Sequence, residues 1–403
     1  MPDRATGMNL PLAVGSGGMG RRNTLIVIVT ALVVVVAAVV VVVRVNADDG
    51  PNWTTSDAPP PTVGTAPPTS FDKPAWRQPL TSPYSQAAVS DGYVAVREPN
   101  GVRVYDLPTG KERWHYLDSG RELTDVAVGN GRLTTVSDGE VRLFDLATGK
   151  GRAVVSVPTG DDRTAVPYRD GFLVLSNGNA DDPYRMYTAS GKQRWSHFPE
   201  SCVGATRPYL GDDVLVIVSY CGPTLHVASL DKDANMLWRQ KLADTTSPGL
   251  GTPVTPASLP KGAPLLLVSQ GKVTPVDTAT NTTLPSAPIP DNSELTSVPN
   301  GWCAYEQQQQ PNPVVSCRDA RTGAELTPPF VLPPTDDPDG ATAEIVPGAD
   351  GLTVISTYEG TVTIQGPGSG GTDIRTADPF PKTVYYGPGA LVIKTGAELT
   401  VYS

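Results

Sequence analysis

Few residues in this chain are of types that could carry out bond-making chemistry. The sequence has four cysteines, Cys202, Cys221, Cys303 and Cys317, and three histidines. The cysteines form no C-x-x-C pair, which argues against a structural zinc site, and three histidines are too few for a multi-histidine metal centre. No serine, histidine and aspartate stand in a recognisable nucleophile context. The sequence therefore predicts no catalytic residue, no cofactor site and no metal site.

The four cysteines are predicted to have a structural role. Cys303 and Cys317 flank a glutamine-rich stretch, Gln307 to Gln310, and fall in neighbouring predicted strands. Cys202 and Cys221 bracket the first strands of another repeat. In an oxidising compartment we expect two disulfides, Cys202–Cys221 and Cys303–Cys317, each contributing about 2–4 kcal/mol. Redox activity of these thiols is the functional alternative.

The segment that starts at Asp231 resembles the opening of a calcium loop. Oxygen-bearing side chains occupy its first, third and fifth positions, Asp231, Asp233 and Asn235. However, Met236 stands where such a loop needs glycine, and Leu242 stands where the bidentate glutamate belongs. We therefore expect a turn stabilised by its own side chains, with calcium as the alternative.

Self-similarity is the most informative property of the rest of the chain. The strongest copy, Val102 to Trp114, reads VRVYDLPTGKERW, and partial copies lie at 141–150, 184–195, 225–238, 273–280 and 315–323. Each copy is an alternating strand, a turn built from Asp and Thr-Gly, and a second strand. Another apolar run precedes each copy. Roughly four short strands in about 40–45 residues are typical of a propeller blade.

The two ends of this region complete each other. A degenerate seventh repeat covers 351–364, and an eighth starts at Gly389 but stops after Val401 and Tyr402, one strand short. The segment Asp72 to Trp76 echoes Gly110 to Trp114. An N-terminal strand is therefore expected to complete the last blade, which leaves no open sheet edge. The sequence predicts an all-β fold, an eight-bladed β-propeller over residues 71–403, with seven blades as the alternative.

The repeat resembles that of the PQQ-like (quinoprotein-like) propeller family, Asp-x-x-Thr-Gly-Lys-x-x-Trp. The full pattern occurs once, from Asp106 to Trp114. The resemblance implies that the repeat tryptophans dock between neighbouring blades, here Trp76, Trp114, Trp195 and Trp238. The family includes quinone-carrying redox enzymes and non-catalytic scaffolds. Those enzymes usually carry adjacent cysteines and a calcium-ligating set of Glu, Asn and Asp, and neither can be located here. The resemblance therefore implies the fold and not the cofactor.

The start of the chain predicts a membrane anchor. Leu25 to Val43 is apolar apart from Thr30 and, at ~1.5 Å per residue, nearly matches a ~30 Å hydrocarbon core. Arg21 and Arg22 precede it, so the positive-inside rule puts the N-terminus in the cytoplasm and the remainder outside. We expect a cytoplasmic tail at 1–23 and a retained transmembrane helix at 24–44, a signal-anchor of a single-pass protein. A cleaved signal peptide is the alternative.

The following segment, 45–70, is rich in Pro, Thr and Ala and lacks apolar periodicity. This composition predicts a semi-stiff linker that holds the propeller off the bilayer. The formal net charge of the chain is −10, and residues 1–44 carry a net +3, so the remainder is strongly acidic. Because an acidic surface repels phosphate backbones, nucleic acid is not an expected partner.

These observations favour a non-catalytic binding or scaffold propeller outside the cytoplasm, tethered to the cell membrane of a bacterial envelope. Loop-lined faces of a propeller can bind an envelope protein or a glycan. The alternative is a membrane-tethered quinoprotein oxidoreductase that uses PQQ with calcium. Titration of the chain with quinone and calcium would separate the two hypotheses.

Overall fold

The computed structural model describes most of the chain after residue 50. Two compact units are distinguished, Met1–Gly50 and Pro51–Ser403. The described residues all belong to the second unit: 51–157, 163–176, 184–197, 206–210, 215–221, 224–231, 233–243, 257–258, 262–269, 271–278, 280, 282–289, 293–306, 314–332, 342–348, 351–358, 360–366, 371–378 and 381–403. The predicted tail and the predicted membrane segment lie outside them. Within the described ranges, no helix is sufficiently long and apolar to cross a membrane.

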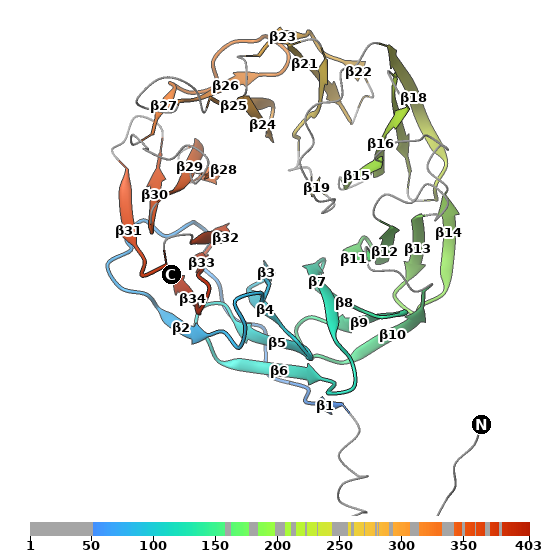
Figure 1. The fold of residues 1–403 in the computed structure, drawn as a ribbon, viewed down its shortest axis with the longest axis vertical. Helices are drawn as coiled ribbons and strands as arrows, with labels where there is room; N and C mark the ends of the chain where they lie inside the picture. The colour runs from blue at the N-terminus through green and yellow to red at the C-terminus, as the bar shows by residue number, and fades with distance from the viewer. Residues whose placement is uncertain are drawn as a thin grey trace, which may run out of the picture. The chain divides into compact units, whose positions relative to one another are not determined.

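The described strands form eight sheets that follow one another around a ring, so the domain is an eight-bladed propeller (Figure 1). The first four blades, with their strands in chain order, are as follows. Blade 1 has β3 (Ala87–Ser90), β4 (Tyr93–Glu98), β5 (Gly101–Asp106) and β6 (Glu112–Leu117), with β1 (Asn52–Trp53) added outside β6. Blade 2 has β7 (Leu123–Gly129), β8 (Arg132–Ser137), β9 (Glu140–Asp145) and β10 (Gly151–Ser156). Blade 3 has β11 (Arg163–Tyr168), β12 (Gly171–Ser176), β13 (Tyr184–Thr188) and β14 (Gln193–His197). Blade 4 has β15 (Thr206–Leu210), β16 (Leu215–Cys221), β17 (Thr224–Leu230) and β18 (Met236–Ala243), with β19 (Ala257–Ser258) parallel to β15.

The remaining blades follow the same order. Blade 5 has β20 (Leu265–Ser269), β21 (Lys272–Asp277), β22 (Thr282–Thr283) and β23 (Ala287–Pro288). Blade 6 has β24 (Ser293–Val298), β25 (Gly301–Glu306), β26 (Val314–Asp319) and β27 (Phe330–Val331). Blade 7 has β28 (Thr342–Gly348), β29 (Gly351–Tyr358), β30 (Thr361–Gln365) and β31 (Thr372–Arg375). Blade 8 has β32 (Lys382–Gly387), β33 (Ala390–Lys394), β34 (Glu398–Tyr402) and β2 (Trp76–Pro79).

The hydrophobic core is divided among the spaces between consecutive blades. One cluster joins Tyr93 and Trp114 of blade 1 to Leu133 and Phe144 of blade 2. Another joins blade 2 to blade 3, and further clusters join blades 3 and 4, 6 and 7, and 7 and 8. The middle strands are buried on both faces because each blade packs against two neighbours. Apolar residues therefore follow one another in these strands, as Tyr93–Val96 do.

The N-terminal strand closes the ring, as the sequence predicts. Strand β2 pairs antiparallel with β34, and Trp76 lies opposite Val401. A core cluster between blades 8 and 1 includes Val392, Val401 and Tyr105, with Trp76 packed against it. Strand β2 and the last strand, β34, thus hold each other in place.

The structure differs from the expected linker over residues 51–70. Strand β1 pairs with β6, and Gly389 donates its backbone N–H to Ala66 O at 2.8 Å. The methyl groups of Val63 lie close to Gly92 and Gly389. This part of the predicted stalk therefore lies against the blades. The physical reason is that backbone hydrogen bonds to distant turns and a few apolar contacts replace the periodic hydrophobic face that the segment lacks.

Candidate functional site

Two of the repeat tryptophans dock on the next blade in the same way. Trp76 Nε1 donates a hydrogen bond to Leu107 O at 2.7 Å, and its ring covers Gly110. Trp114 Nε1 donates to Leu146 O at 2.8 Å, and its ring covers Gly149. These left-handed glycines are needed because a Cβ at either position would overlap the indole.

The other two predicted docking residues differ in what the structure describes. Trp195, on β14, is half-buried and packs against the core cluster shared by blades 3 and 4. Trp238 lies in β18, and its side chain is outside the described part of the chain.

One of the two expected disulfides is present. Cys303 on β25 lies directly opposite Cys317 on β26 in blade 6, and the two are disulfide-bonded. Both residues are buried in the cluster between blades 6 and 7. Cys202 and the side chain of Cys221 lie outside the described residues, so the Cys202–Cys221 pairing stays a prediction.

Asp231 stabilises its own turn. Its carboxylate accepts hydrogen bonds from the backbone N–H groups of Asp233 and Asn235 at 2.8 and 2.9 Å, and from the Asn235 side chain at 3.0 Å. The bond from the Asn235 side chain is the main reason that the pKa of Asp231 lies below its ordinary value. Among the described residues, no cluster could hold a metal ion.

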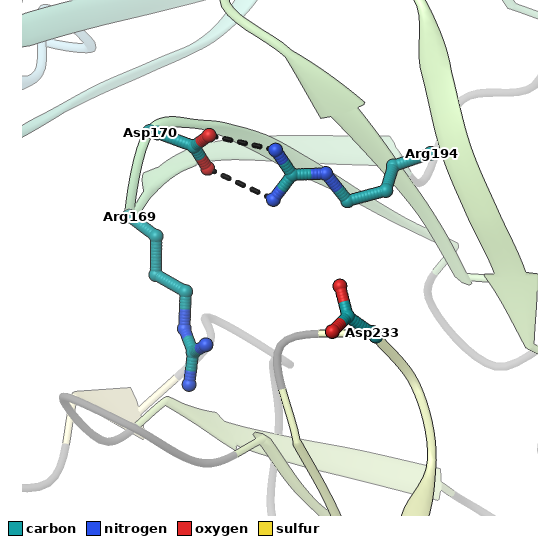
Figure 2. Close-up of a pocket in the computed structure, with 4 residues that line it drawn as sticks. All are labelled: Arg169, Asp170, Arg194 and Asp233. Atoms are coloured by element: carbon teal, nitrogen blue, oxygen red, sulfur yellow. Dashed lines mark hydrogen bonds and ion pairs between the residues drawn. The ribbon is translucent and has the colours of Figure 1, made fainter.

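A charged groove between blades 3 and 4 is the candidate site. It encloses about 410 Å³ and is lined by Arg169, Asp170, Arg194 and Asp233 (Figure 2). Arg169 and Asp170 form the turn between β11 and β12, Arg194 lies on β14, and Asp233 belongs to the turn between β17 and β18. We call this site the 3–4 groove.

One wall of the 3–4 groove is an ion pair. Arg194 donates two hydrogen bonds to the two carboxylate oxygens of Asp170, at 3.0 and 2.7 Å. These bonds hold the pKa of Asp170 below its ordinary value and raise the pKa of Arg194. The bidentate geometry fixes both side chains and leaves the pair electrically neutral at neutral pH.

The other two charged residues have hydrogen-bonding capacity to spare. The Nε and Nη2 groups of Arg169 are shielded from solvent and donate to no acceptor in the described part of the chain. The guanidinium lies over the Tyr168 ring, 5.1 Å from its centroid. Asp233 is exposed, and Figure 2 shows it facing Arg169 and Arg194 across the groove. The covered Arg169 donors would have to turn outward to reach a ligand, whereas the Asp233 carboxylate is already exposed.

Arg169 also has an unusual backbone conformation. Its φ is 53°, in the left-handed region. The corresponding turns of blades 1 and 2 have Asp91 and Asn130 with positive φ at this point. Aspartate and asparagine tolerate this conformation better than arginine does. Strain of this kind is common at functional sites.

The sequence patterns do not indicate Arg169, Asp170 or Arg194 as site residues, although Asp233 falls in a predicted turn. A signal for Arg169 exists, because aligning the repeats shows arginine where blades 1 and 2 have Asp91 and Asn130. Arg194 has a weaker signal, since it precedes Trp195 as Arg113 precedes Trp114.

Comparisons with known proteins place the chain in a family. The family model described as outer membrane protein assembly factor BamB matches residues 69–165 and 137–363. The chain therefore belongs to this family of PQQ-like propellers. A comparison with curated protein sequences found no match.

Solved structures share the fold at low sequence identity. BamB from Moraxella catarrhalis is 15% identical with a TM-score of 0.53, and the match covers 82% of this chain and 98% of that one. The C-terminal WD40 domain of Sif2 is 11% identical with a TM-score of 0.51, over 80% of this chain and 97% of that one. Both likenesses concern the propeller fold.

Proposed function

We propose that the chain is a non-catalytic scaffold, tethered to the cell membrane with its propeller outside the cytoplasm, which binds an envelope protein at the 3–4 groove. The observation that carries this proposal is the exposed Asp233 carboxylate across the groove from Arg169, whose covered donors lack acceptors. A partner that pairs with Asp233 and draws the Arg169 guanidinium out of its covered position would give it the hydrogen bonds that it lacks.

The expected location outside the cytoplasm has two independent supports. The sequence predicts an anchor at Leu25 to Val43 with arginines before it. The Cys303–Cys317 disulfide is typical of proteins that fold in an oxidising compartment. These two supports favour a partner in the cell envelope. The family match to an outer membrane protein assembly factor also favours such a partner.

The binding proposal is tested by purifying the tagged full-length chain from native membranes after crosslinking. We expect a specific protein to co-purify with the wild type and to be lost when Arg169→Asn and Asp233→Asn are combined. Arg375→Gln is the matched control, since Arg375 lines a different groove, between blades 7 and 8. Equal recovery of the protein with the double variant would contradict the proposal.

The tethering proposal is tested separately on intact cells. Protease added outside should digest the propeller, and the chain should stay in the membrane fraction after a carbonate wash. Release by carbonate, or protection from external protease, would contradict the proposed location.

A further inference from the structure

Residues 51–66, which we call the N-terminal clasp, first contact blades 1 and 2 through residues 53–59 and then reach the turns at Gly92 of blade 1 and Gly389 of blade 8. Trp53 makes edge contacts with Tyr116 of blade 1 and Phe144 of blade 2, and its Nε1 donates to Gly149 O at 3.0 Å. Ser56 N donates to Thr148 O at 2.9 Å. On the other side, Arg113 donates to the carbonyl oxygen of Pro59.

The 3–4 groove lies at the corresponding place in the repeat. Arg194 on β14 and Arg113 on β6 each stand immediately before the docking tryptophan of their blade. In the turn of the following blade, Asp233 and Thr148 each stand immediately before a left-handed residue, Ala234 with φ 61° and Gly149 with φ 71°. The clasp contacts Arg113 and Thr148. The 3–4 groove therefore occupies, between blades 3 and 4, the position that the clasp occupies between blades 1 and 2.

The tryptophans beside the clasp and beside the 3–4 groove are buried to different extents. Trp114 is fully buried over Gly149, because glycine allows the indole within van der Waals contact of the turn. In blade 4 that position is Ala234, and Trp195 is half-buried, as Trp76 is over Gly110.

The charges of the two grooves differ in a way that specifies the ligand. In the clasp, Asp57 forms an ion pair with Lys150, Nζ to Oδ1 at 2.9 Å. Asn235 occupies the position of Lys150 in the shorter turn of blade 4, and that turn also carries the exposed carboxylate of Asp233. A segment that follows the path of the clasp would thus meet the carboxylate of Asp233 where the clasp meets the ammonium group of Lys150.

The geometry points to an extended, proline-containing segment of a partner protein as the ligand of the 3–4 groove, with a basic residue facing Asp233. Its backbone carbonyl oxygens would accept hydrogen bonds from Arg194, which keeps donors beyond its two bonds to Asp170, much as Pro59 O accepts from Arg113. Proline suits this role because it favours the extended conformation and lowers the entropy lost on binding. This inference rests on the proposed binding function of the same groove.

The test uses two synthetic peptides with the sequence of residues 51–66, one native and one with Asp57→Lys, titrated into the full-length chain and followed by fluorescence anisotropy. The clasp is expected to keep its own site occupied, because it is part of the same chain. We expect the Asp57→Lys peptide to bind at least about tenfold more tightly than the native peptide. Asp233→Lys in the protein should reverse this order, and Arg375→Gln should leave it unchanged.

Absence of binding by both peptides, or an order that Asp233→Lys does not reverse, would overturn the inference. The proposed function can be judged independently of this result. If the double variant Arg169→Asn, Asp233→Asn loses the co-purified protein while neither peptide binds, the groove binds a partner but not through an extended segment. The double variant could keep the co-purified protein while Asp233→Lys still reverses the relative affinities of the two peptides. In that case the proposed scaffold function fails and the inference about the peptide ligand stands.

Discussion

At the scale of single residues, Arg169 combines a backbone conformation that arginine disfavours with buried donors that lack acceptors. Both features reduce stability, and neither is needed by a β-turn, since the corresponding turns of blades 1 and 2 use Asp91 and Asn130. A residue retained at such a cost is expected to act in binding rather than in folding.

Arg169→Asn is expected to raise the free energy of unfolding by about 0.5–1 kcal/mol, because asparagine fits the left-handed turn and leaves no buried guanidinium. The same variant should weaken partner binding. Urea denaturation checks the first effect. The matched control is Asn300→Arg, which puts arginine at φ 63° in blade 6 and should destabilise by a similar amount. A less stable Arg169→Asn variant would contradict the strain argument.

Two left-handed glycines separate backbone strain from packing. A Cβ at Gly149 would lie 2.5 Å from Cδ2 of Trp114, whereas nothing lies within 4 Å of a Cβ at Gly131. Gly131→Ala should cost about 1 kcal/mol through conformation alone. Gly149→Ala should cost about 1–3 kcal/mol more, because the docked indole must move. Equal midpoints of urea denaturation for the two variants would show that the docking contact is unimportant.

At the scale of elements, the turn after the third strand of a blade is stabilised by its aspartate. In blade 2, Asp145 accepts hydrogen bonds from Thr148 N and Oγ1 at 3.0 and 2.8 Å and from Arg152 at 2.7 Å. Burial alone would raise the pKa of Asp145, but the bonds from Arg152 and Thr148 outweigh it and hold this pKa below its ordinary value.

A depressed pKa in the folded state gives these turns an acid-dependent stability. Unfolded aspartate titrates near ~4. The stabilisation by Asp145 is complete above that pH and is lost as the pH falls through the lower pKa of the folded protein. Unfolding measured between pH 7 and pH 3 should show a loss of stability that Asp145→Asn makes smaller. An identical pH dependence in the variant would contradict this assignment.

The disulfide of blade 6 is expected to stabilise the domain through the short loop that it closes. Cys303 and Cys317 are 14 residues apart. Replacing both with alanine should lower the free energy of unfolding by about 2–3 kcal/mol. Because both positions are buried, part of the loss would come from packing, and Cys303→Val with Cys317→Ala controls for it. A loss below about 0.5 kcal/mol in both variants would show that the bond has no stabilising role.

The elements that repeat could be predicted from the sequence, and those that do not repeat could not. The repeat seen at Asp106 to Trp114, with its partial copies, specifies a strand, a turn and a second strand. The eight blades and the closing strand at Trp76 could therefore be predicted from the sequence. The clasp was missed because its prolines resemble a linker and its contacts are single hydrogen bonds to distant turns. The 3–4 groove was missed because Arg169 and Asp233 are far apart in sequence and meet only when two blades pack together.

At the scale of the whole molecule, the ring is held closed by the pairing of β2 with β34 and by Trp76, which bridges blade 8 and blade 1. Trp76→Ala should lower the free energy of unfolding by about 2–3 kcal/mol, since the indole is half-buried. Hydrogen exchange should increase first in β34 and in the Leu107 turn. Increased exchange confined to blades 4 and 5 would contradict a closing role.

The clasp also determines how the propeller would respond to mechanical load. Its attachments are met one after another along the chain, from the two-residue strand β1 through Ser56, Asp57 and Pro59 to Ala66, and only then the ring-closing strand β2. A pull applied at Pro51 would therefore peel these weak attachments one at a time, each with little force, before any tension reached β2. Under tension the segment would extend, and the eight blades would stay joined.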